Sequence, residues 1–244
     1  MCTVVLRVDP NGPLPLAYAG NRDEMIDRPW DPPGPWWADL PDVAGGRDRL
    51  AGGTWLGVNR HGVVAGVLNR TGSLGPQPGK RSRGELPLLA LRHSTAAAAA
   101  AAIATTDAGD WRSYNLVLAD RTGAFFVRGT GAGRPAVLPL GAGVHVIASS
   151  DPNDPEHPRV ARHLPRFRAA PPPSPDDWDG WRAILADRSG PADSEINVPP
   201  DGTRPGFGTV SAAMLFLPAT GAPSFLFAPG PPDRHGFAPV PWPG

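Results

Sequence analysis

The chain has 244 residues, enough for one large domain with a sizeable core, and we expect a single domain over residues 1–244. Its 23 Lys and Arg balance its 23 Asp and Glu, so a positively charged nucleic-acid surface is not expected. The sequence has no run of about 18 apolar residues that could span a bilayer. The first apolar run is too short for a signal peptide, because Arg7 and Asp9 interrupt it. We therefore expect a cytoplasmic protein without nucleic-acid partners.

The chain carries its only cysteine, Cys2, directly after Met1. A methionine before a small residue is normally removed, which would give Cys2 a free α-amine beside its thiol. Such an amine has a pKa of roughly 7.7–8.0, and terminal amine–nucleophile pairs carry out acyl transfer. Residues 3–8 are largely apolar on both alternating faces, which predicts a strand buried on both sides. The alternative is that Cys2 is only a small buried apolar residue.

A second extended run, residues 16–20, leads into Asn21-Arg22-Asp23-Glu24 after a turn at residues 9–13. This pattern predicts a hairpin that returns Asn21–Glu24 to the vicinity of Cys2. In a regular strand Arg22 and Asp23 point to opposite faces, so a bulge or turn at Gly20-Asn21 would be needed for both to reach Cys2. The alternative is a solvated, charged strand end.

Residues 28–41 are rich in Pro and Trp and predict an ordered loop, which could wall an apolar pocket or pack on a sheet. We expect strands at residues 52–59, 63–69, 114–119, 125–128, 144–149, 207–217 and 224–227. We expect one helix from Glu85 or Pro87 to about Thr105, and two short helices near residues 156–168 and 176–188, with Pro165 as an interruption. Hairpins alternating with helices predict an α+β fold of antiparallel sheets layered with helices.

Taken together, these stretches resemble the NRDE family, also known as transport and Golgi organisation protein 2. The matching segments are Met1-Cys2-Thr3, Asn21–Glu24, Ala51–Asn59, Ser82–Glu85 and Tyr114–Leu116. That family is similar to the N-terminal nucleophile hydrolases, and its start resembles the choloylglycine hydrolase and penicillin V acylase branch. The resemblance implies a four-layer αββα sandwich of two antiparallel sheets, with the terminal cysteine at a sheet end.

The resemblance also implies roles for individual residues. Cys2 would attack the carbonyl of a linear amide or related acyl compound, with its own amine as the base. Arg22 matches the arginine of the branch's second strand and would lower the pKa of the thiol. Asn69 matches an asparagine whose amide could stabilise the oxyanion by about 3 kcal/mol. Its alternative role is that of a turn asparagine before residues 70–72.

Three positions depart from the branch. The aspartate of the branch lies three residues after the arginine, where this chain has Met25, so Asp23 is a catalytic candidate only if a bulge or turn at Gly20-Asn21 brings it to Cys2 together with Arg22. Ser150 stands where relatives tend to have asparagine. Val210 stands where an arginine is common, which puts recognition of a charged substrate in doubt. The candidates for substrate binding are Asn21, Trp55 and Ser150.

Two functions follow from these residues. The first is hydrolysis of a small-molecule acyl or amide substrate at Cys2. The second is binding or trafficking of a hydrophobic ligand without efficient turnover, because eukaryotic members of the family are linked to haem mobilisation and to lipid or acyl-CoA metabolism. The six histidines show no metal-ligand spacing, so we expect no metal site. Haem is a possible ligand, but no distinctive feature of the sequence supports it, since neither a lone His nor a Cys specifies an axial ligand.

Overall fold

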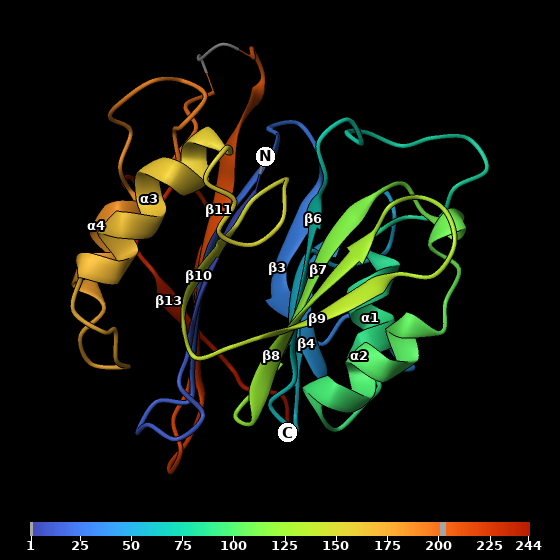
Figure 1. The fold of residues 1–244 in the computed structure, drawn as a ribbon, viewed down its shortest axis with the longest axis horizontal. Helices are drawn as coiled ribbons and strands as arrows, with labels where there is room; N and C mark the ends of the chain where they lie inside the picture. The colour runs from blue at the N-terminus through green and yellow to red at the C-terminus, as the bar shows by residue number, and fades with distance from the viewer. Residues whose placement is uncertain (1, 201–203) are drawn as a thin grey trace. The chain divides into compact units, whose positions relative to one another are not determined.

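The computed structural model describes residues 2–200 and 204–244, and the chain forms two compact units. Unit 1 combines Met1–Arg28 with Ala142–Val240, and unit 2 combines Pro29–Gly141 with Pro241–Gly244. Each unit is an antiparallel sheet with two α-helices packed on it (Figure 1). This organisation confirms the α+β class predicted from the sequence.

In the described part of unit 1, six strands form a sheet in the order β10-β1-β2-β11-β12-β13. Their bounds are β1 Thr3–Val8, β2 Leu16–Met25, β10 Gly143–Ile147, β11 Phe207–Leu217, β12 Ser224–Ala228 and β13 Ala238–Val240. The predicted hairpin is confirmed, because β1 pairs with β2 from Val8 opposite Leu16 to Thr3 opposite Asn21. Cys2 therefore precedes an interior strand, held between β10 and β2.

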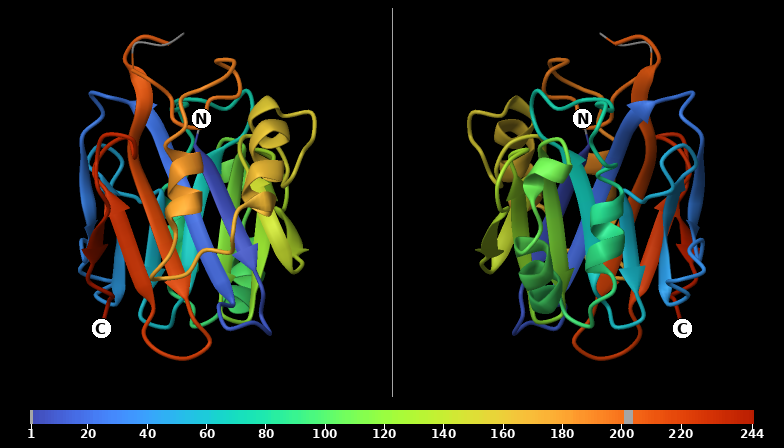
Figure 2. Two further views of the ribbon diagram at one scale, coloured as in Figure 1. Left: turned by 90° about the vertical axis from the view of Figure 1, so that its left-hand side faces the viewer. Right: turned by 90° about the vertical axis from the view of Figure 1, so that its right-hand side faces the viewer.

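Two helices, α3 Pro158–Ala169 and α4 Asp179–Leu185, cover one face of this sheet (Figure 2, left). Phe167 of α3 and Trp181 of α4 meet edge to face, with ring centroids 5.2 Å apart, over the sheet residues of the same core cluster. The expected interruption at Pro165 is wrong, since α3 continues through it. Pro165 lies on the exposed side of α3, where water can satisfy the carbonyl that lost its partner.

Strand β11 contains a bulge opposite the Asn21–Glu24 segment. Thr209 pairs with Asp23 and Ser211 pairs with Arg22, which leaves Val210 as an extra residue. A bulge re-aims the side chains on one side of it, because two residues oppose one on the partner strand. Thr209 is thereby turned onto the same face as Asp23, whereas an unbroken strand would place it on the face of Ser211.

In the described part of unit 2, seven strands form a sheet in chain order from β3 to β9. Their bounds are β3 Trp30–Gly34, β4 Val43–Asp48, β5 Leu56–Asn59, β6 Val64–Asn69, β7 Tyr114–Asp120, β8 Gly123–Gly129 and β9 Ala136–Leu140. Helices α1 Glu85–Ala90 and α2 Ala96–Ala104 pack on this sheet, and a 3-10 turn, η1 Ala108–Asp110, follows (Figure 2, right). The predicted β5–β6 and β7–β8 hairpins are confirmed.

Two predictions for unit 2 are wrong in detail. The Pro- and Trp-rich stretch contains strand β3, which is an edge strand, where a missing proline N–H is tolerated. The expected single helix is two helices, because Thr95 adopts an extended backbone and its side chain accepts a hydrogen bond from the Ala98 N–H. Thr95 thus begins a new helix as an N-cap instead of continuing the first one.

Candidate active site

Cys2 lies partly buried at the start of β1. Its Sγ is 3.7 Å from the backbone carbonyl oxygen of Asp23 and can donate a hydrogen bond to it. The hairpin therefore does bring the Asn21–Glu24 segment to the thiol, as the sequence predicted. The contact is made by the backbone carbonyl oxygen of Asp23.

The side chains of Arg22 and Asp23 lie on opposite faces of the sheet, as expected for a regular strand. Asp23 points toward the helices, where one carboxylate oxygen accepts a hydrogen bond from Arg159 Nη1 of α3 at 3.0 Å. The other oxygen accepts from Thr209 Oγ1 of β11 at 2.7 Å. The pairing of β1 with β2 is regular through Gly20 and Asn21, so the bulge or turn that would let both side chains reach Cys2 is absent there.

Burial raises the pKa of the Cys2 thiol above its usual value, and the negative charge of Asp23 raises it further. The positive charge of Arg22, itself only 6% exposed, opposes these effects but is the smaller influence. Arg22 lowers the pKa of the thiol, as expected, but burial and the charge of Asp23 outweigh it, so the net pKa is raised. A thiol in this setting is neutral near pH 7, so it needs a base before it can act as a nucleophile.

Asn21 is buried and uses both hydrogens of its side-chain amide within unit 1. Its Nδ2 donates to the carbonyl oxygens of Leu185 and Ile196, each at 2.9 Å. These two carbonyl groups lie at the two ends of the segment that follows α4, so the Asn21 side chain holds both ends of that segment next to β2. Its assignment to substrate binding stays a prediction.

Ser150 follows the end of β10, two residues after the buried Ala148. Strand β10 pairs with β1 up to Val4 opposite Ile147, so the segment that continues to Ser149 and Ser150 runs on toward the Cys2 end of β1. Ser149 Oγ is 3.2 Å from Nε2 of His157, the residue that precedes α3. Burial lowers the pKa of His157, so a neutral imidazole is favoured there.

Asn69 belongs to unit 2, at the end of β6 opposite Tyr114, and begins a loop that two arginines hold. Arg70 donates to the buried Asn115 side chain at 2.6 Å. Arg83, from the Ser-Arg-Gly-Glu segment, donates to the Ser73 carbonyl oxygen at 2.7 Å. The family-like segments of unit 2 thus converge on the backbone that follows Asn69 and fix its course.

Trp55 also belongs to unit 2 and precedes β5. Its ring packs edge to face on Trp30, with centroids 5.8 Å apart. It also lies over Gly46, where a Cβ atom would come within 2.2 Å of the indole ring. Trp55 is partly exposed, and its assignment to substrate binding stays a prediction.

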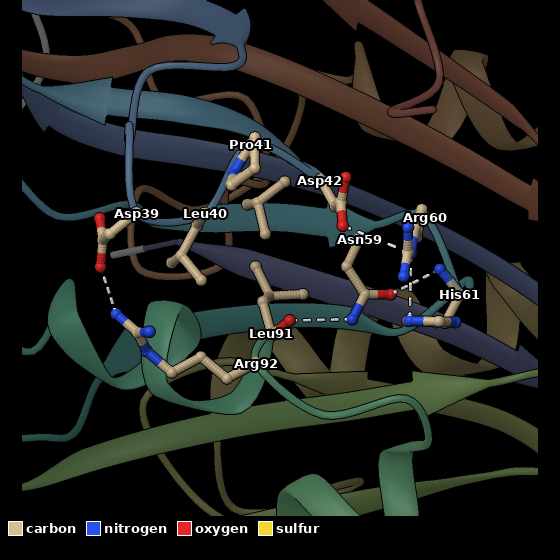
Figure 3. Close-up of a pocket in the computed structure, with 10 residues that line it drawn as sticks. Asp39, Leu40, Pro41, Asp42, Asn59, Arg60, His61, Leu91 and Arg92 are labelled. Atoms are coloured by element: carbon tan, nitrogen blue, oxygen red, sulfur yellow. Dashed lines mark hydrogen bonds and ion pairs between the residues drawn. The ribbon is translucent and has the colours of Figure 1, made fainter.

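A separate hollow of about 230 Å³ lies within unit 2, between the segment before β4 and the end of α1 (Figure 3). Its floor is apolar, with Leu40 and Leu91, and its charged side chains pair across it, as in the ion pair of Arg60 with Asp42 at 3.3 Å. The Asn59 side chain binds backbone groups around it, including the Leu91 carbonyl oxygen at 2.9 Å. This hollow shares no residue with the predicted site.

Histidine, cysteine and carboxylate side chains are the groups that could bind a metal ion or haem iron. Among residues 2–200 and 204–244, no group of three or more His, Cys, Asp or Glu side chains is arranged to hold a metal ion. Haem would need an axial ligand such as a histidine or a thiolate. His163 has both ring nitrogens in hydrogen bonds, so it does not fit that role. In the described chain, no helix is long and apolar enough to cross a membrane.

Two residues of the site were missed by the sequence reasoning. Arg159 and Thr209 bind the Asp23 carboxylate from positions 136 and 186 residues away in the chain. The available signal for Arg159 was an arginine directly after Pro158, at the start of an amphipathic helix and beside the buried Val160. Such a position faces the core, where a charge needs a partner.

Comparison with known proteins places these features in a family. A family model described as Transport and Golgi organisation 2 matches residues 1–174. A mouse (Mus musculus) protein, the Transport and Golgi organization 2 homolog, is 30% identical over 129 residues, which cover 49% of this chain and 45% of the mouse protein. The chain thus spans about half the length of that relative.

The structure is also similar to three solved hydrolases. An N-acylethanolamine-hydrolyzing acid amidase ortholog from Caenorhabditis elegans matches with a TM-score of 0.54 and 12% identity, over 88% of this chain and 92% of that one. A mutant of conjugated bile acid hydrolase from Clostridium perfringens matches with a TM-score of 0.54 and 12% identity, over 99% and 97%. Penicillin V acylase from Agrobacterium tumefaciens matches with a TM-score of 0.51 and 14% identity, over 99% and 98%. These matches confirm the predicted N-terminal nucleophile hydrolase fold.

Proposed function

Because this chain belongs to the Transport and Golgi organisation 2 family and has the fold of amide hydrolases, we propose that it is an N-terminal cysteine hydrolase of linear amides or related acyl compounds. The observation that carries the proposal is the position of Cys2. It precedes an interior strand, its Sγ contacts the Asp23 carbonyl oxygen, and the charge of Arg22 acts on it.

The neutral thiol explains why the proposed reaction needs an α-amine. After removal of Met1, the amine of Cys2 takes the thiol proton while sulfur bonds to the substrate carbonyl carbon. The amine then returns the proton to the leaving nitrogen, the C–N bond breaks, and a thioester remains. Water hydrolyses the thioester, which releases a carboxylic acid and restores the thiol.

The other residues have supporting roles in this proposal. Arg22 offsets part of the charge and burial that disfavour the thiolate. Asp23 acts through its backbone, so it positions Cys2 and does not itself transfer protons. Asn69 is the proposed donor to the oxyanion only because it matches the asparagine of the acylase branch. Trp55 and Ser150, which are both partly exposed, remain the proposed substrate contacts.

The substrate is proposed to be a small acyl amide. The structural neighbours are named for an N-acylethanolamine, a conjugated bile acid and penicillin V. One compound of each class should be incubated with the purified protein, and the released amine measured. We expect cleavage of at least one, abolished by Cys2→Ala. Cleavage that persists in Cys2→Ala, or no cleavage of any acyl amide by protein whose mass shows that Met1 is gone, would contradict the proposal.

A binding protein on the same scaffold is the second candidate function. Two observations favour it: the thiol is held neutral, and position 210, where an arginine is common, carries the buried Val210 of the bulge. Its ligand would be an acyl chain, in keeping with the lipid connections of the family. Equal affinity of wild type and Cys2→Ala for a fatty acyl-CoA, measured by calorimetry and with no product formed, would favour this function over hydrolysis.

A further inference from the structure

The Asp23 carboxylate is enclosed by donors from two other elements. Arg159 is 4% exposed and its Nη1 donates to both Asp23 Oδ2, at 3.0 Å, and Thr3 Oγ1, at 2.8 Å. Thr209 Oγ1 donates to the second carboxylate oxygen and accepts from the Val198 N–H at 2.8 Å. Arg159 therefore ties α3 to β1 and β2 together, at the end of the hairpin where Cys2 lies.

This ion pair is buried on both sides, with side-chain exposures of 5% for Arg159 and 0% for Asp23. A carboxylate in such a place is costly unless a cation and hydrogen bonds compensate it. The same charge lies close enough to Cys2 to disfavour its thiolate. A guanidinium bound to Asp23 reduces the field that reaches the sulfur, because its positive charge offsets part of the negative charge of the carboxylate.

We propose that Arg159 is the counter-charge of the Cys2 site, a positioning residue that keeps the negative charge of Asp23 from suppressing thiolate formation. The inference rests on the proposed function, since compensation of the Asp23 charge is useful to the protein only if Cys2 reacts. The effect of Arg159 on the Cys2 thiol can be measured whether or not the protein turns over a substrate.

The test uses alkylation of Cys2 by iodoacetamide, which reports on one site because the chain has a single cysteine. Rates are measured against pH for wild type, Arg159→Met, Asp23→Asn, the double variant, and Arg168→Met as a control on the exposed side of the same helix. Folding of each protein is checked by its Tm.

We expect Arg159→Met to raise the pH midpoint of alkylation, by up to the roughly 1–3 pH units that an unbalanced neighbouring charge commonly causes. Asp23→Asn should lower the midpoint, the double variant should return near wild type, and Arg168→Met should change nothing. An unchanged midpoint in folded Arg159→Met, or a shift of the same sign in Arg159→Met and Asp23→Asn, would overturn the inference.

If Arg159→Met does not fold, the comparison of Asp23→Asn with the double variant decides. In Asp23→Asn the Arg159 guanidinium has no carboxylate to balance it, and the double variant removes that positive charge. The pH midpoint of alkylation must therefore be higher in the double variant than in Asp23→Asn, and equal midpoints overturn the inference. The proposed function is judged separately. If the wild type does not cleave any acyl amide, the proposed function fails, but the shifts in the alkylation midpoint can still be observed. If the wild type cleaves an acyl amide and the variants show no shift in the midpoint, only the role of Arg159 fails.

Discussion

The stability of this protein should fall in mild acid because His163 is held neutral in unit 1. His163 lies on α3 with 0% exposure. Its Nε2–H donates to the Ser194 carbonyl oxygen at 2.9 Å, and its Nδ1 accepts from Arg166 at 3.0 Å. Burial lowers the pKa of His163 to about 4, and the positive charges of Arg166 and Arg162 contribute to the same shift. Protonation would leave Nδ1 with a hydrogen aimed at a guanidinium.

The sign and size of the effect follow from this pKa. Between pH 6.5 and pH 4 the unfolded chain binds a proton at this histidine and the folded chain does not, so acid favours unfolding. The stabilisation is fully present above pH 6.5 and is lost as the pH falls through about 4. A difference from about 6.5 to about 4 corresponds to roughly 3 kcal/mol in total, and to about 2 kcal/mol between pH 7 and pH 5.

Urea unfolding followed by tryptophan fluorescence at pH 7, 6 and 5 measures this loss. His163→Gln keeps a side-chain amide that can donate to Ser194 but has no proton to gain. We expect the wild type to lose about 2 kcal/mol more than the variant between pH 7 and pH 5. Equal losses in the two proteins would refute the reasoning, because the other titrating groups are the same in both.

Three further predictions concern stability and can be measured by urea unfolding at pH 7. Asn21→Ala leaves the Leu185 and Ile196 carbonyl oxygens without their donor and should cost about 2 kcal/mol or more, whereas Asn11→Ala in the exposed turn should cost less than about 0.5 kcal/mol. Gly53→Ala should cost about 1–3 kcal/mol, since its Cβ would lie 2.4 Å from the Gly84 carbonyl carbon, while Gly123→Ala has open space and should be nearly neutral. Thr209→Val removes the donor to Asp23 and the acceptor of the Val198 N–H and should cost about 1–3 kcal/mol; a loss below about 0.5 kcal/mol would contradict the role given to the bulge.

Much of unit 1 could be predicted because its central contact is local in sequence. The turn between β1 and β2 and the alternation along each strand were enough to place Asn21–Glu24 beside Cys2 and to put Arg22 and Asp23 on opposite faces. The partners of Asp23 could not be predicted in this way. They come from α3 and β11, and the bulge that directs Thr209 depends on how β11 pairs with β2.

The errors have the same origin. The acidity of the Cys2 thiol was judged from the nearby charge of Arg22, whereas burial, which is a property of the folded unit, is the larger influence. In unit 2, Pro32 and Pro33 favoured a loop in the sequence, but an edge strand accepts them because one side of it needs no ladder hydrogen bond. Thr95 was treated as part of an alanine-rich helix although threonine is a good N-cap.

The central claim is that Cys2 is a nucleophile that forms a thioester, and acyl-enzyme trapping tests it most directly. Protein whose intact mass shows the loss of Met1 is mixed with an activated acyl ester and quenched in acid at short times. The account predicts a mass increase of one acyl group, located on Cys2, removed by hydroxylamine and absent from Cys2→Ala. An adduct that persists in Cys2→Ala, or processed protein that gains no acyl group while its thiol remains open to iodoacetamide, would contradict it.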